Sequence, residues 1–105
     1  MGHVLYHKLV RDHIPEIIMA SGRRCQVVEL PEDEYLTMLE KKLTEELAEY
    51  QQSKSLEELA DLMEVIRAVA EARGSSMEAV EAIRVQKAEK RGGFKRRLLL
   101  REVWD

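Results

Sequence analysis

The chain has 105 residues with a net charge of −3, from 17 lysines and arginines against 20 aspartates and glutamates. This length predicts a single domain over residues 1–105, and a hydrophobic content of 45% argues against a disordered chain. No apolar stretch approaches the roughly 20 residues that cross a bilayer. The start MGHVLYHKLVRD lacks the apolar core of a signal peptide, so we expect a cytoplasmic protein with no membrane partner. The single cysteine, Cys25, excludes an intramolecular disulfide and a zinc site built from several cysteines.

The small net charge conceals two blocks of opposite sign. Residues 29–64 contain twelve acidic and three basic residues, a charge of −9. Residues 84–101 contain eight basic residues and one acidic residue, a charge of +7. Two such blocks in one small domain indicate either mutual neutralisation or two functions at one site.

The composition favours an all-α fold with four helices, because aromatic residues are only 5% and leucine, alanine and long charged residues are abundant. The first helix is expected to begin near Asp12, an acceptable N-cap, and to end at residues 21–22. Segments 4–10 and 25–30 on either side of it read as irregular or extended. The second helix is predicted over residues 32–51, with a buried stripe formed by Leu36, Leu39, Leu43, Leu47 and Tyr50.

A tight turn at residues 53–55 is predicted to join the second helix to a third. Ser55 and Glu58 match a capping box at the start of this third helix. The helix is expected to run to about Arg73, with Gly74 as the residue that ends it. Its predicted buried stripe consists of Leu59, Leu62, Met63, Ile66 and Val69.

Four carboxylates are expected to converge between the second and third helices. At about 100° per residue they flank the buried stripes, and the short turn forces the two helices into an antiparallel hairpin. Positions whose numbers sum to 107 then lie at one level, which gives two layers about one helical turn apart. These layers are Glu49 with Glu58, and Glu46 with Asp61. Three other acids are expected to face away: Glu45, Glu57 and Glu64.

Converging carboxylates need compensation, because like charges at short range are unfavourable. Oxygen ligands without a nearby histidine or cysteine favour Mg²⁺, or Mn²⁺ as a substitute, and Mg²⁺ commonly binds substrate phosphates. The alternative interpretation is an ordinary solvated glutamate face, in which Glu58 acts only as the third residue of its capping box.

The fourth helix is predicted to begin at a capping box formed by Ser75 and Glu78 and to run to Arg91. Along it, the apolar stripe of Val80 and Ile83 changes into lysines. Such a basic end can hold phosphate, although the helix macrodipole alone also favours basic residues there. A nucleic-acid interface is less favoured, because no aromatic residues interleave with the charge and the whole chain is acidic. The basic residues in question are Lys87, Lys90 and Arg91.

The other polar and aromatic candidates carry weaker signals. The three histidines (His3, His7 and His13) lack helical metal-binding spacing, so surface or packing roles are expected. Cys25 has no activating partner and is interpreted as structural. The tail over residues 94–104 is expected to be extended, and Trp104 is interpreted as a packing anchor at a subunit contact.

Several stretches resemble one known family. Glu45-Glu46-Leu-Ala-Glu49, followed by Glu58-Leu-Ala-Asp61, resembles the EExxE…ExxD signature of the MazG-like all-α nucleotide pyrophosphohydrolases. YHKLVRDHIPEII at residues 6–18 and KAEKRGGF at residues 87–94 resemble a subgroup often labelled phosphoribosyl-ATP pyrophosphohydrolase-like. The resemblance implies a four-helix MazG-like bundle with short extended terminal segments, assembled as a homodimer or a dimer-based tetramer. The short connection between the two motifs leaves the substrate open.

The resemblance also implies an activity, the cleavage of a nucleotide between its α and β phosphates to give a monophosphate and pyrophosphate. It implies Mg²⁺ ligands at Glu46, Glu49, Glu58 and Asp61, a secondary role for Glu45, and Glu46 or Glu49 as the residue that orients water. The expected phosphate and substrate contacts are Lys87, Lys90, Arg91, Lys8 and Arg11. General nucleotide-pool cleaning is favoured. A phosphoribosyl-ATP pyrophosphohydrolase of histidine biosynthesis and a non-catalytic helical dimerisation or regulatory module are the alternatives.

Overall fold

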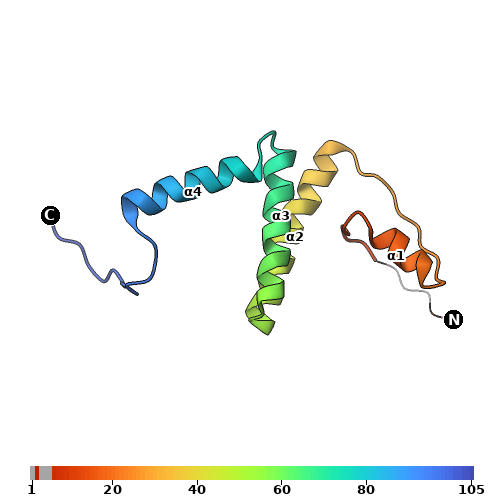
Figure 1. Ribbon diagram of the computed structural model, residues 1–105, viewed down its shortest axis with the longest axis horizontal. Helices are drawn as coiled ribbons and strands as arrows, with labels where there is room; N and C mark the ends of the chain where they lie inside the picture. The colour runs from red at the N-terminus through yellow and green to blue at the C-terminus, as the bar shows by residue number, and fades with distance from the viewer. Residues whose placement is uncertain (1, 3–5) are drawn as a thin grey trace.

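The computed structural model describes residue 2 and residues 6–105. The prediction for His3 and the start of the expected segment 4–10 lie outside these residues. Within the described part of the chain there are four helices and no strands (Figure 1), so the all-α prediction is confirmed. The helices are α1 (Ile14–Ala20), α2 (Glu32–Ser53), α3 (Leu56–Ala72) and α4 (Met77–Arg91).

Helices α2 and α3 form an antiparallel hairpin whose turn is built from local signals. Pro31 is the N-cap of α2, and three acidic residues follow it in the first turn, where the positive end of the helix dipole favours them. Lys54 ends α2 in the left-handed conformation, with φ 60°. Ser55 then caps α3, because its side chain accepts a hydrogen bond from the backbone N–H of Glu58 at 3.3 Å. The predicted turn is confirmed at Lys54 and Ser55, whereas Ser53 still belongs to α2, which extends two residues beyond the predicted end at residue 51.

The buried apolar core is small and lies between α2 and α3. Its members are Leu39, Val65 and Ala70. Only Leu39 of the two predicted stripes belongs to this core, and the buried α3 residues Val65 and Ala70 were not among those predicted. Leu47 of α2 and Met63 of α3 are 45% and 56% exposed, and Leu59 is also exposed. The physical reason is that one helix can cover only part of its neighbour's apolar face, and the core of this hairpin is centred on Val65 and Ala70.

Helix α4 begins one residue later than the sequence indicates. Gly74, with φ 81°, ends α3 in a Schellman motif: its N–H bonds the Glu71 carbonyl at 3.0 Å, and the Ser75 N–H bonds the Ala70 carbonyl at 2.8 Å. Ser75 is thereby committed to the end of α3. The N-cap of α4 is Ser76, whose side chain accepts a hydrogen bond from the backbone N–H of Ala79 at 3.1 Å.

The molecule is elongated, because only α2 and α3 pack along their length. Helix α4 leaves the hairpin on one side and α1 lies on the other (Figure 1). The radius of gyration is 18.6 Å, whereas a compact domain of this length has about 13 Å. A closed four-helix bundle would therefore need helices from outside this chain. No helix in the described residues is both long and apolar enough to cross a membrane.

Candidate metal centre

Five carboxylates on α2 and α3 form two overlapping acidic groups. The first group is Glu45, Glu46 and Glu49, and the second is Glu46, Glu58 and Asp61. Within each group, one oxygen from each residue lies within 4.8 Å of the others. The hairpin thus brings the expected pair Glu46 and Asp61 together with Glu58, whereas Glu49 shares a group with Glu46 but not with its expected partner Glu58. Glu46 belongs to both groups. The expectation that Glu45 faces away is wrong, because this residue lies beside Glu46 on the same edge of α2.

Glu46 is the buried member of the cluster. Its residue is only 6% exposed, and its Oε2 atom has no hydrogen-bond partner among the described residues. Burial raises the pKa of Glu46, the neighbouring charge of Glu49 raises it further, and the pairing with Lys42 opposes the rise. Natural proteins seldom leave a buried carboxylate oxygen without a partner. The unpartnered oxygen is therefore an indication that this site accepts a ligand.

The Glu58 carboxylate is also available to the site. A reciprocal capping box would use this carboxylate to bond the backbone N–H of Ser55. That N–H instead donates to the side-chain oxygen of Ser53 at 3.3 Å. In the part of the chain that the structure describes, Glu58 Oε2 is buried without a hydrogen-bond partner. Only the backbone N–H of Glu58 takes part in the cap of α3. Its carboxylate does not bond the Ser55 N–H and is therefore available to the acidic cluster.

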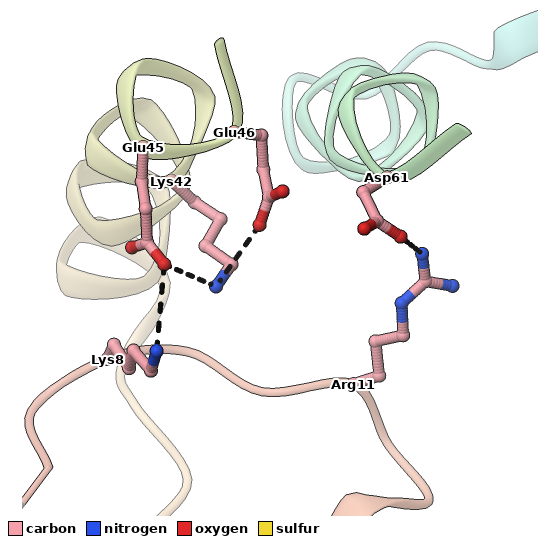
Figure 2. A network of polar contacts seen from close by, with 6 residues as sticks. All are labelled: Lys8, Arg11, Lys42, Glu45, Glu46 and Asp61. Atoms are coloured by element: carbon pink, nitrogen blue, oxygen red, sulfur yellow. Dashed lines mark hydrogen bonds and ion pairs between the residues drawn. The ribbon is translucent and has the colours of Figure 1, made fainter. Parts of the chain in front are cut away.

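Basic side chains face the carboxylates (Figure 2). The Nζ atom of Lys42 lies 3.2 Å from Glu45 Oε1 and 3.4 Å from Glu46 Oε1. Two further bases come from the N-terminal segment 6–13, which passes beside the hairpin: Lys8 lies 3.8 Å from Glu45, and Arg11 donates to Asp61 at 2.7 Å. Sequence reasoning missed Lys42, although its spacing of three and four residues from Glu45 and Glu46 is a usable signal.

The other expected phosphate ligands lie elsewhere. Lys87, Lys90 and Arg91 are exposed near the end of α4, and the described residues offer them no ion pair. Because α4 points away from the hairpin (Figure 1), a single chain does not place them at the carboxylates.

The expected roles of several other residues are not visible in one chain. Trp104 is 79% exposed, so the single chain gives it no packing partner among the described residues. Cys25 is exposed, with its Sγ atom 3.9 Å from the Pro15 carbonyl. His7 and His13 are exposed and lie outside both acidic groups.

The donor set suits a hard divalent cation. Every candidate ligand atom is a carboxylate oxygen, which matches the preference of Mg²⁺ and Mn²⁺. The buried, unpartnered oxygens of Glu46 and Glu58 are the two atoms that such an ion would satisfy. The residues present therefore fit this class of ion.

Comparisons with known proteins add one partial match. No family model matches the chain, and no solved structure gives a significant match. A protein of Mycolicibacterium smegmatis (strain ATCC 700084 / mc(2)155), described as uncharacterized, is 55% identical over 42 residues. The aligned stretch covers 40% of this chain and 43% of that protein.

Proposed function

We propose that the chain is a Mg²⁺-dependent nucleotide pyrophosphohydrolase of the MazG-like type. It would cleave a nucleoside triphosphate, or a related nucleotide, between the α and β phosphates to give a monophosphate and pyrophosphate. The observation that carries the proposal is the buried Glu46 carboxylate, which belongs to both acidic groups and has one unpartnered oxygen. The order of the acidic residues along the chain, which resembles EExxE…ExxD, supports the same reaction.

Each part of the cluster has a separate task in this proposal. Glu46, Glu49, Glu58 and Asp61 would hold the ion. When bound, Mg²⁺ supplies charge neutralisation at the phosphates and a water of lowered pKa. Glu49 is exposed at the edge of the cluster, where it can orient the attacking water and accept its proton. Lys8 and Arg11 already lie against the carboxylates and can hold substrate phosphates beside them.

The remaining basic residues would act from a second copy of the chain. Helix α4, which carries Lys87, Lys90 and Arg91 toward its C-terminal end, extends away from the hairpin that carries the cluster (Figure 1). A homodimer or dimer-based tetramer could bring the basic end of α4 near a partner's acidic hairpin, since the two blocks carry opposite charges. The proposed role of these residues as a clamp on the departing phosphates depends on that assembly.

A non-catalytic helical association module is the second candidate. The large exposed apolar surface of the chain favours association whether or not the cluster is catalytic. The two candidates differ in one respect, because only the enzyme turns over nucleotides in the presence of Mg²⁺.

A panel of nucleotides with Mg²⁺ tests the proposal. Nucleoside triphosphates, damaged nucleotides and phosphoribosyl-ATP are incubated with the protein, and pyrophosphate is scored against phosphate. We expect Mg²⁺-dependent release of pyrophosphate. Asp61→Asn and Glu49→Gln should each lower kcat/KM by about 100-fold or more, as the loss of one electrostatic contributor does in other enzymes.

The matched control is Glu64→Gln, which removes an exposed carboxylate from the same helix as Asp61. It should leave turnover unchanged. Full Mg²⁺-dependent pyrophosphate release by the Asp61→Asn and Glu49→Gln proteins would overturn the assignment of the metal site. Turnover of phosphoribosyl-ATP alone would assign the chain to the biosynthetic alternative.

A further inference from the structure

Lys42 lies within the carboxylate cluster and is its least exposed basic residue. Its side chain is 19% exposed, compared with 48% for Lys8 and 59% for Arg11. The ammonium group is shared between Glu45 and Glu46, at 3.2 and 3.4 Å (Figure 2). All three residues belong to one stretch of α2, at spacings of three and four residues, so the contact forms within one helix and needs no movement of a loop.

The cluster contains more acid than its bases can neutralise. Five carboxylates (Glu45, Glu46, Glu49, Glu58 and Asp61) face three bases, and two of those bases come from the exposed segment 6–13. An exposed ion pair is weak and is screened by salt. Lys42 is therefore the strongest compensating charge in the metal-free chain. Burial alone would lower its pKa, but the hydrogen bond and charge of Glu45, followed by those of Glu46, outweigh this effect and raise the pKa.

A divalent cation and an ammonium group would compete for the same carboxylate. The Lys42 ammonium lies against Oε1 of Glu46, while Oε2 of that carboxylate has no partner. An ion bound to Glu46 would place two or more positive charges close to the ammonium, and like charges at that distance repel strongly. The four-carbon stem of lysine gives Lys42 room to withdraw, and Glu45 remains available as its second partner.

We infer that Lys42 is the built-in counter-cation of this centre: it neutralises Glu45 and Glu46 while no divalent ion is bound, and it gives way at Glu46 when one binds. Lys42 thereby sets the affinity for the ion without ligating it. The inference rests on the metal site of the proposed function, but its test needs neither nucleotide nor turnover.

The experiment compares Lys42→Met with Lys41→Met by calorimetric titration with MnCl₂ and MgCl₂ and by thermal melting with and without each ion. Lys41 is exposed, adjacent on the same helix and equal in charge, so its substitution controls for net charge. Removing the Lys42 ammonium should lower the dissociation constant of the ion by about tenfold. It should also lower the melting temperature of the metal-free protein while leaving the ion-saturated protein close to wild type. Lys41→Met should change neither quantity appreciably.

Lys42→Arg provides a second test, because it retains the charge and should keep the affinity within about threefold of wild type. It also keeps the inference testable if Lys42→Met does not fold without the ion. An unchanged or weaker affinity in a folded Lys42→Met protein would overturn the inference, as would an Arg variant that binds the ion tenfold more tightly.

If the wild-type protein binds neither ion, the proposed function fails first. If it binds them and Lys42→Met behaves as Lys41→Met, only the role of Lys42 fails.

Discussion

Glu46 combines two properties that a purely structural carboxylate rarely shows together. It is buried on the inner edge of a hairpin, and one of its oxygens has no hydrogen-bond partner. Burying a charge is unfavourable unless the charge is paired, and a buried carboxyl group with a raised pKa is a typical sign of a functional site. The surrounding acids raise the cost of ionising Glu46, and a divalent cation removes that cost.

The pH dependence of stability reports on this residue. Because the pKa of Glu46 is raised above its ordinary value of 4.5, the folded metal-free chain binds the proton more tightly than the unfolded chain does. Its contribution to stability is complete below pH 4.5 and is lost as the pH rises through the raised pKa. Glu46→Gln should remove this loss and flatten the profile. Urea unfolding at a series of pH values, with a chelator present, measures the effect.

Glu64→Gln serves as the control for this measurement, since Glu64 is exposed on α3. Its profile should follow that of the wild type. Adding Mg²⁺ should reverse the trend in the wild-type protein, because the ion binds the ionised carboxylate and so stabilises more as the pH rises. An identical pH slope for wild type and Glu46→Gln would contradict the role given to the buried carboxylate.

At the scale of the helices, local signals predicted the hairpin that carries the site. The Pro31 start of α2, the two-residue turn and the Ser55 cap are all properties of neighbouring residues, and they suffice to set the antiparallel register. The register in turn brings Glu46 and Asp61 to one level. The group of Glu46, Glu58 and Asp61 was therefore predictable from the sequence, whereas the grouping of Glu45 with Glu46 and Glu49 was not.

Features that depend on packing could not be predicted in the same way. The predicted buried stripes included exposed residues and missed Val65 and Ala70, because periodicity gives the apolar face of a helix but not which part of it another helix covers. The position of Lys8 and Arg11 beside the carboxylates depends on the path of an irregular segment, which no periodicity describes. The direction of α4 depends on the few residues between α3 and α4 and is likewise not contained in the helical pattern.

The start of α4 offers a direct test at this scale. Ser76 is the N-cap, whereas Ser75 belongs to the Schellman motif that ends α3 and gives only its backbone N–H. Ser76→Ala should therefore destabilise the first turn of α4 by about 1 kcal/mol, while Ser75→Ala should have a much smaller effect. Amide hydrogen exchange in residues 77–80 measures the difference. A larger effect of Ser75→Ala would restore the capping box predicted from the sequence.

The whole molecule exposes more surface than an isolated domain of its size. Its accessible area is 10054 Å², whereas a compact monomer of 12.2 kDa exposes about 6,000 Å². The excess is of the size that permanent subunit interfaces bury. An open apolar groove of about 310 Å³, lined mainly by Leu43, Ile66, Val69, Ala70 and Val80, lies where α2, α3 and α4 meet. We propose that a second copy of the chain covers it.

The assembly prediction follows from this geometry. In solution we expect a particle of at least twice the chain mass, because hydrophobic burial of the excess surface outweighs the entropy lost on association. Ile83 is 55% exposed on α4, beyond the groove residue Val80, and Ile83→Glu should weaken association by at least tenfold by placing a charge in the interface. Val28→Glu is the control, since Val28 is equally apolar and 74% exposed but lies in the irregular segment before α2.

Sedimentation equilibrium measures the mass, and small-angle scattering measures the shape. A monodisperse 12.2 kDa particle with a radius of gyration near 18.6 Å would contradict the assembly and, with it, the phosphate-clamp role of Lys87, Lys90 and Arg91.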